Sequence, residues 1–376
     1  MIKLIHTSDW QLGKPFARMS VEATVALQEA RLEAIDALGK LAADEAASDV
    51  LVAGDVFDAA EPHDRTVRQA LLRMAGYGCR WWLLPGNHDY ARSEGLWDRL
   101  KRDAPKNIHA LIEPVPMELT TGAWLLPAPL THRRAEHDPT DVFSGMNTPT
   151  DSVRIGLAHG PIQSFGRHEE AKNLIASNRA QVDGLDYLAL GDWHGHVMIG
   201  ERTAYSGTPE PDDFGRETTG GALLISIQGN GVTPTVNFKT TAKYSWREAE
   251  WNPVSGLADV EKRIEALRQQ ENLSRLVLRL HLSGLVGLSE RVRIREHLES
   301  GLAHDVRWLD LQSDDLFVRP TQDELEEIDA HGVLRLVADR LQAITQRDGR
   351  EGLVAMAALE RLYVETLKAR RRGDAA

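Results

Sequence analysis

Short apolar runs that each end in a polar, metal-capable residue constrain this 376-residue chain more than any other feature. The run over residues 81–84 is typical of a buried strand, and the Pro-Gly turn after it presents Asn87, His88 and Asp89 together. An amide oxygen can bind a metal ion, an imidazole can hold or deliver a proton, and a carboxylate can orient that imidazole. Taken alone, these side chains could equally face water.

The same pattern occurs twice before this turn. A run over residues 2–7 leads to Asp9, with Gln11 two residues on, and a run over 49–53 ends at Asp55. Open α/β sheets bind ligands beyond the carboxyl ends of their strands, so we expect these side chains to meet at one edge. Asp9 by itself would more simply cap its turn, but the repetition favours a shared site.

Two later strand-like runs end in residues of the same kind. One leads to His159, and the other leads to Asp192 and His194, with His196 two residues further. Residues separated by one point to the same side of an extended chain, which places Asp192, His194 and His196 on one side. The run over residues 188–191 fixes the end of the strand, so Asp192 and His194 are the preferred pair. A shifted register that uses His194 and His196 stays open.

Carboxylate, imidazole and amide ligands without a thiolate suit Mn²⁺, Fe or Zn at a reactive centre rather than a structural zinc site. The candidate ligands are Asp9, Gln11, Asp55, Asn87, His159, Asp192 and His194. They are too many for one ion with an open position, and they suit two ions roughly 3.5–4 Å apart, as in phosphoryl chemistry. We expect Asp55 to bridge the ions. His88, held by Asp89, would stabilise charge or protonate the leaving oxygen.

The order of these motifs resembles that of the calcineurin-like metallophosphoesterases. The stretches IHTSDWQLGKPF, LVAGDVFD and YSGTPEP are most similar to SbcD-type DNA repair exonucleases within that superfamily. The resemblance implies an α/β fold, a two-sheet β-sandwich flanked by helices with a smaller α+β capping domain and C-terminal helices. It also implies two divalent ions, of which Mn²⁺ is the expected identity, and His88 as the catalytic histidine.

Two positions depart from the family's pattern. Gln11 stands where the family usually has a histidine, and Asp192 stands where it has the first histidine of the last motif. The resemblance assigns one ion to Asp9, position 11, Asp55 and His194, and the other to Asp55, Asn87, His159 and position 192. Because glutamine is a weak neutral ligand, we expect the first ion to bind loosely or with an extra water. Asp192 favours a harder ion such as Mn²⁺.

Changes of pattern along the chain predict three parts. These are a nuclease domain over 1–240, an α+β capping-like domain over 244–328 and a helical segment over 330–376. The middle part could narrow the groove at the site or serve only in packing or dimerisation. The helical segment could dock on an SMC-like ATPase or fold back on its own domain, and both readings stay open. We also expect a helix over 168–177.

Composition limits the compartment and the mode of binding. The formal net charge of −12 argues against non-specific nucleic-acid binding over the whole surface, but not against a local basic groove. No apolar run approaches the length of a membrane span, and the N-terminus has no signal-peptide pattern. The single cysteine, Cys79, excludes an internal disulfide. We therefore expect a cytoplasmic protein without a membrane partner.

The leading hypothesis is a dinuclear-metal phosphodiesterase that acts on DNA ends in repair, working with an SMC-like ATPase. A second hypothesis is a metallophosphoesterase for small phosphoesters or cyclic nucleotides. A third is a catalytically weakened subunit that binds DNA ends, which Gln11 and Asp192 motivate. Whether the chain forms a homodimer stays open.

Overall fold

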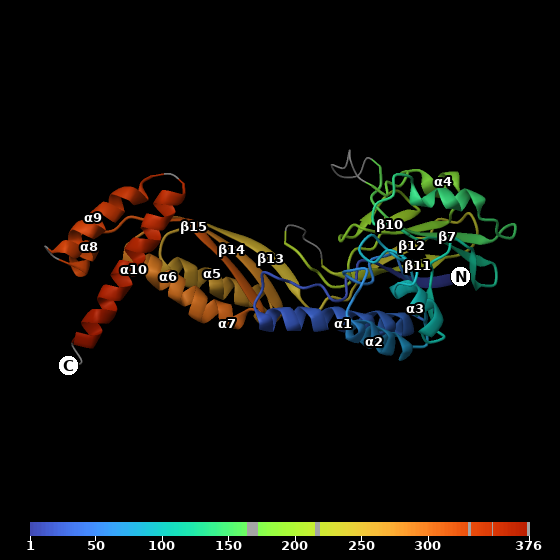
Figure 1. The fold of residues 1–376 in the computed structure, drawn as a ribbon, viewed down its shortest axis with the longest axis horizontal. Helices are drawn as coiled ribbons and strands as arrows, with labels where there is room; N and C mark the ends of the chain where they lie inside the picture. Colours follow the sequence, from blue (N-terminus) through green and yellow to red (C-terminus); the bar gives the residue numbers. More distant parts are fainter. Residues whose placement is uncertain (164–171, 215–218, 330–331, 348, 374–376) are drawn as a thin grey trace. The chain divides into compact units, whose positions relative to one another are not determined.

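The computed structural model describes residues 1–163, 172–214, 219–329, 332–347 and 349–373. It divides into two compact units, an N-terminal unit over Met1–Ser245 and a C-terminal unit over Trp246–Ala376 (Figure 1). Every candidate ligand from Asp9 to His194 belongs to the N-terminal unit. Among the described residues no helix is both long and apolar enough to cross a membrane.

A six-stranded mixed sheet forms one layer of the N-terminal unit, in the order β12-β11-β1-β2-β3-β4. Its strands are β1 (Ile2–Thr7), β2 (Asp49–Val52), β3 (Arg80–Leu83), β4 (Ile108–Ala110), β11 (Gly221–Ile227) and β12 (Thr235–Thr240). Strands β1 to β4 run parallel, whereas β11 pairs antiparallel with both β1 and β12. The carboxyl ends of β1, β2 and β3 therefore lie at the same edge of the sheet.

A second six-stranded sheet has the order β5-β6-β7-β8-β10-β9. Its strands are β5 (Met117–Thr120), β6 (Ala123–Ala128), β7 (Val153–His159), β8 (Tyr187–Gly191), β9 (Val197–Met198) and β10 (Thr203–Tyr205). Strands β6, β7, β8 and β10 are parallel. His159 is thus the last residue of β7, and Asp192 directly follows β8.

The two sheets pack face to face around a shared apolar core. Leu51 and Ile225 of the first sheet belong to one buried cluster with Leu125 and Leu157 of the second. This arrangement confirms the predicted two-sheet sandwich, in which inward-facing side chains of both layers form the core. The buried cluster on the other face of the first sheet joins its strands to helices α1 (Val21–Asp44), α2 (Asp64–Ala75) and α3 (Leu96–Asp103) (Figure 1).

Local signals fix where the helices begin. The Ser20 side chain accepts a hydrogen bond from the Ala23 backbone N–H at 3.2 Å and so caps the start of α1. Helix α4 (Arg179–Val182) and a 3₁₀ helix over Pro139–Gly145 pack beside the second sheet, where Ala180 and Phe143 join its buried cluster.

The helix predicted over 168–177 is wrong for residues 172–177, and residues 168–171 lie outside the described part of the chain. Ile175 instead forms a β-bridge with Ile162. The Asn173 backbone has a left-handed φ of 61°, and its side chain accepts a hydrogen bond from the Ala135 N–H at 2.6 Å. These tertiary contacts hold an irregular segment despite its helix-like spacing of apolar residues.

The C-terminal unit is built on a three-stranded sheet in the order β13-β14-β15. The strands are β13 (Ser245–Val254), β14 (Leu276–Val286) and β15 (Trp308–Val318), and β14 pairs parallel with β15. Helices α5 (Leu257–Gln270) and α6 (Leu288–His297), followed by the short α7 (Ala303–Asp305), cover one face of the sheet (Figure 1). Ile264 of α5 and Ile294 of α6 share a buried cluster with Leu278.

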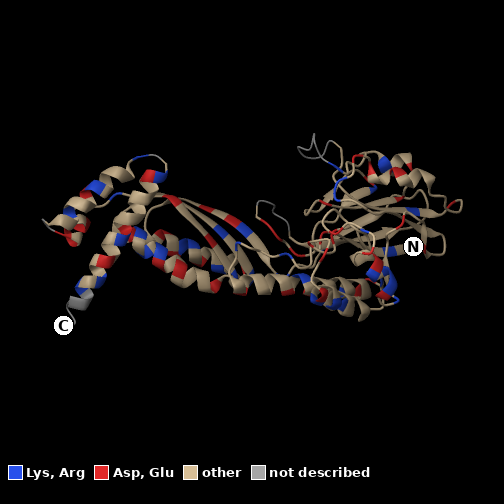
Figure 2. Ribbon diagram, in the orientation of Figure 1, with Lys and Arg blue, Asp and Glu red and all other residues tan. Residues whose placement is uncertain are grey.

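Three helices end the chain: α8 (Gln322–Ile328), α9 (Val333–Thr345) and α10 (Arg350–Gly373). Ala338, Met356 and Leu359 bury their side chains in one cluster between them. Basic and acidic residues are interspersed along α9 and α10 (Figure 2). The sequence-based separation of 330–376 from 244–328 stays a prediction, since both ranges, apart from residues 244 and 245, lie in the C-terminal unit.

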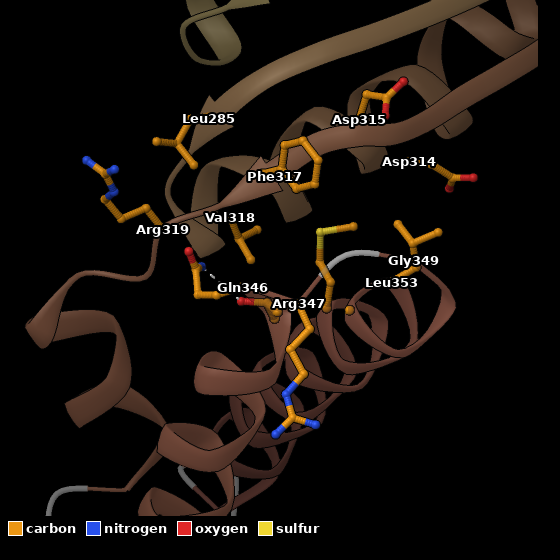
Figure 3. Close-up of a pocket in the computed structure, with 13 residues that line it drawn as sticks. Leu285, Asp314, Asp315, Phe317, Val318, Arg319, Gln346, Arg347, Gly349 and Leu353 are labelled. Carbon is orange, nitrogen blue, oxygen red and sulfur yellow. Dashed lines mark hydrogen bonds between the residues drawn. The ribbon is translucent and has the colours of Figure 1, made fainter.

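A cavity of about 490 Å³ lies between the end of β15 and the start of α10. Phe317 and Leu285 line it from the strands, and Leu353 and Met356 line it from the helix (Figure 3). Phe317 and Leu285 remain about half exposed, at 49% and 46%.

Candidate metal centre

Asp9, Asp55 and His159 bring one ligand atom each to within 4.8 Å of one another, and all three side chains are buried. They follow or end three different strands, β1, β2 and β7, so the two sheets together assemble the cluster. The strand-end pattern of the sequence predicts that these side chains, from distant parts of the chain, lie close together. Buried carboxylates are stable when they are protonated, paired with a cation or bound to a metal ion.

The backbone turns sharply where each strand delivers its side chain. Asp9, Asp55 and Asp192 have positive φ angles of 54°, 52° and 103°. Residues other than glycine rarely adopt this left-handed region, and aspartate and asparagine tolerate it best. Such strained turns persist only where the surrounding structure holds them, as at functional sites. The turns are what aim these carboxylates into the cluster.

One side of the cluster presents unpaired ligand atoms. The His159 Nε2 atom lies 3.6 Å from Asp55 Oδ1 and 3.8 Å from Asp192 Oδ1. Asn87 donates its Nδ2–H to Asp192 Oδ1 at 3.3 Å. Asn87 Oδ1 and His159 Nε2 are buried without a hydrogen-bond partner among the described residues. Unpaired buried atoms of this kind, beside two carboxylates, fit a divalent cation.

The charge on this side is acidic. Burial lowers the pKa of His159, but the charges of Asp55, Asp9 and Asp192 outweigh burial and raise that pKa to about 9. Burial also raises the pKa of Asp192 above its ordinary value. The His159 ring is fixed from behind, because its Nδ1 lies 2.8 Å from the Ala53 carbonyl and so carries the proton in the neutral ring. When the ring is neutral, its Nε2 lone pair therefore faces the carboxylates, as a metal ligand requires.

The other side of the cluster is formed by His194. Its Nε2 lies 3.9 Å from Asp9 Oδ1 and 3.3 Å from Gln11 Nε2. Its Nδ1 donates a hydrogen bond to Asp212 Oδ1 at 2.9 Å. Burial lowers the pKa of His194, and the hydrogen bond and charge of Asp212 reverse this effect and raise the pKa overall.

Asp212 contacts the cluster through His194 and was not among the residues predicted from the sequence. Its carboxylate also pairs with Lys14 Nζ at 2.6 Å and with an Arg31 guanidinium nitrogen at 3.1 Å. Burial raises the pKa of Asp212, but the hydrogen bond with His194 and the charges of Arg31, His194 and Lys14 outweigh burial and hold that pKa well below its ordinary range. The acidic run after Pro209 was the only signal, and burial of one of its members could not be read from the sequence.

The expected orientation of His88 by Asp89 is wrong. The His88 Nδ1 atom donates instead to the Asp58 backbone carbonyl at 3.0 Å. The Asp89 carboxylate accepts hydrogen bonds from the Gly86 N–H at 2.7 Å and the Phe57 N–H at 3.0 Å. Burial and the Asp55 charge raise the pKa of Asp89 to about 8, against these two donors. Asp89 therefore ties the two loops together, and among the described residues no hydrogen bond joins its carboxylate to the His88 ring.

His88 lies at the open edge of the cluster. Its side chain is 35% exposed, and its Nε2 lies 4.0 Å from Asp55 Oδ2. The His88 backbone N–H donates to Asp55 Oδ1 at 2.9 Å. His196, the alternative to Asp192 in a shifted register, is exposed and stacks on Phe238. The structure thus brings Asp192 and His194 to the cluster and leaves His196 outside it.

Comparison with known proteins gives a family and two named relatives. Residues 2–196 match the sequence profile of a family described as Calcineurin-like phosphoesterase. An Escherichia coli protein, named as a subunit of the nuclease SbcCD, is 35% identical over 345 residues, which cover 74% of this chain and 85% of that protein. A Bacillus subtilis protein with the same name is 24% identical over 357 residues, covering 78% and 83% respectively.

Among solved structures, TT1561 of Thermus thermophilus has a TM-score of 0.40 with 12% identity. The match covers 64% of this chain and 99% of that one.

Proposed function

We propose that this chain, which belongs to the calcineurin-like phosphoesterase family, is a metal-dependent nuclease. It would hydrolyse the phosphodiester bonds of DNA. The observation that carries the proposal is the convergence of Asp55, His159 and Asp192 around buried, unpaired ligand atoms. The two relatives named as subunits of the nuclease SbcCD support a nucleic acid as the substrate. The match also extends over most of the Escherichia coli protein, of which this chain covers 85%.

The proposed ligands divide between two positions that share Asp55. His159, Asn87 and Asp192 would hold one ion, and Asp9 and His194 would hold the other. Divalent ions in these positions would neutralise charge on the phosphate and lower the pKa of a water molecule. Mn²⁺ is the proposed ion, because two carboxylates with an amide and one imidazole form a hard ligand set.

His88 is the proposed proton donor to the leaving oxygen. Its Nδ1 is fixed by the Asp58 carbonyl, so the ring presents Nε2 towards Asp55. A partly exposed imidazole beside the cluster can reach a bound phosphodiester, and it can stabilise the charge that develops there. No other described histidine combines this position with this exposure.

The test is a Mn²⁺-dependent assay of the purified chain beside His88→Ala. The substrates are linear duplex DNA, single-stranded DNA, cyclic AMP and bis-p-nitrophenyl phosphate, and exposed His137→Ala is the matched control. We expect DNA degradation that falls by about 10²–10⁴ in His88→Ala and is unchanged in the control. Turnover of small substrates alone would instead favour a general phosphoesterase, and DNA binding without turnover would favour a non-catalytic protein.

The proposed partner is an SMC-like ATPase, working with this chain in the cytoplasm. Both relatives are named as parts of a larger nuclease, which supports a complex. In the C-terminal unit, α9 exposes Val333, Leu334, Leu336 and Val337, at 74%, 44%, 70% and 42%. A contiguous apolar helix face of this kind suits docking against a coiled coil, and a second copy of this chain is the competing occupant.

A further inference from the structure

Lys14 fixes the orientation of the Gln11 side chain. Its Nζ lies 2.9 Å from Gln11 Oε1 and 2.6 Å from Asp212 Oδ2. An ammonium group only donates hydrogen bonds, so the amide oxygen of Gln11 must face it. The opposite orientation of the amide would place its NH₂ group against the ammonium group of Lys14. The oxygen and nitrogen of the Gln11 amide, which have nearly the same shape, are therefore assigned by this contact.

The NH₂ group of Gln11 consequently faces His194. Gln11 Nε2 lies 3.3 Å from His194 Nε2, while His194 Nδ1 bonds to the Asp212 carboxylate. The proton of the neutral ring is therefore on Nδ1, and the Nε2 lone pair accepts from the Gln11 amide. That lone pair is the one with which His194 would bind a metal ion.

The two sides of the cluster are thus prepared differently. On the His159 side, His159 Nε2 and Asn87 Oδ1 are unpaired among the described residues. On the His194 side, the Gln11 amide and a metal ion would compete for one lone pair. The cations of Lys14 and Arg31 also lie on that side, paired with Asp212. The Gln11 side chain therefore donates a hydrogen bond that competes with the metal ion for His194, whereas a histidine at position 11 would add a metal ligand.

We infer that Gln11 competes with the metal for His194 instead of binding the metal, so the two ions bind with unequal affinity. The tighter ion lies on the side of Asn87, His159 and Asp192, and the weaker ion lies on the side of Asp9 and His194. This inference rests on the proposed two-ion nuclease, whose activity would then rise with Mn²⁺ concentration as the weaker position fills. Lys14 acts as a positioning residue that holds the competing amide in place.

The test is isothermal titration of the metal-free full-length chain with Mn²⁺ at pH 8. We expect two steps, with the second about tenfold or more weaker than the first. Gln11→His supplies a ligand and should tighten the second step by about tenfold or more, the lower end of what one metal-site partner contributes. Gln11→Ala removes the competitor and should leave the second step as tight as, or tighter than, in the wild type.

Two controls assign the steps. Asn87→Ala should weaken the tighter step, and exposed Gln181→Ala should change neither. A weaker second step in Gln11→Ala would show that Gln11 is a ligand and overturn the inference. Two equal steps in the wild type, or an absent second step in Gln11→His, would overturn it as well. Failure of every variant and of the wild type to bind Mn²⁺ would instead remove the proposed metal centre itself.

Discussion

Gly86 occupies a position where a side chain would collide with the centre. A Cβ atom built there would lie 2.1 Å from Asp55 Oδ1 and 2.3 Å from the Asp55 backbone nitrogen. Gly86→Ala must therefore displace Asp55, because the backbone nitrogen cannot rotate away as a long side chain could. We expect Mn²⁺ affinity to fall by at least about tenfold, measured by titration calorimetry.

The control for this substitution is Gly78→Ala, where a Cβ atom would meet no atom within 4 Å. It should bind Mn²⁺ as the wild type does. Equal affinity in Gly86→Ala and the wild type would mean that the loop can relax and that Asp55 is not held by this close approach.

Asp212 pairs with Arg31, a cation whose side chain is only 1% exposed. Asp212→Ala should destabilise the fold by about 3–5 kcal/mol, since it leaves a buried cation uncompensated. Urea unfolding in the presence of a metal chelator measures this loss of unfolding free energy. The exposed neighbour Asp213→Ala should cost less than about 1 kcal/mol. Similar losses in both variants would contradict this role of Asp212.

The sequence predicts the ligand side chains of the cluster but not the groups that hold those side chains in place. Asp9, Asp55 and His159 could be predicted because each follows a recognisable apolar run. The hydrogen-bond partner of His88 could not be predicted, because it is the backbone carbonyl of Asp58 and every residue has such a carbonyl. Asp212 was missed because pairing with Arg31 joins residues that are remote in sequence.

His6 joins the two sheets as a buried neutral imidazole. Its Nε2 donates to the Leu190 carbonyl at 3.1 Å, and its Nδ1 accepts from the Tyr187 hydroxyl at 2.8 Å. Burial lowers the pKa of His6 from 6.5 to about 3. Between these values the unfolded chain binds a proton that the folded chain does not. The stability contributed by His6 is therefore complete above pH 6.5 and is lost as the pH falls towards 3.

His6→Gln keeps one donor and one acceptor but cannot titrate. Between pH 7 and pH 5 the wild type should lose about 2 kcal/mol more of its unfolding free energy than His6→Gln does. Urea unfolding at both pH values measures this, with exposed His137→Gln as the control that should follow the wild type. Equal losses in His6→Gln and the wild type would show that His6 is not the titrating group.

The elements were predicted well where periodicity and burial agree. The strand β1 covers the apolar run over residues 2–7, and β2 lies within the run over 49–53. The segment 172–177 was mispredicted because Asn173 bonds to Ala135 across the fold, and such a contact leaves no trace in local spacing. Helix α8 was missed because its seven residues are too few to show a period, although Thr321 and Glu324 form a capping box.

The division into two units predicts that the metal centre is complete in the first. A fragment over 1–245 contains every proposed ligand and both large sheets. We expect it to unfold cooperatively and to bind Mn²⁺ with the affinities of the full chain, as measured by calorimetry. Loss of Mn²⁺ binding in a fragment that still folds would show that the C-terminal unit shapes the centre.

The exposed face of α9 is the proposed contact with an ATPase partner. The double variant Val333→Glu with Leu336→Glu should leave the unfolding free energy within about 0.5 kcal/mol, because both side chains are mostly exposed. It should abolish co-purification of a coiled-coil ATPase from the native host. Leu72→Glu with Val182→Glu, equally exposed in the N-terminal unit, is the control. Retention of the ATPase by the α9 variant would contradict the proposal.

The most direct measurement of the two-ion centre is anomalous scattering at the manganese edge from crystals grown in saturating Mn²⁺. We expect two peaks roughly 3.5–4 Å apart. One should lie against Asn87 and His159, the other against Asp9 and His194, with Asp55 between them. No peak in the cluster, or manganese bound only elsewhere on the chain, would contradict the proposed centre.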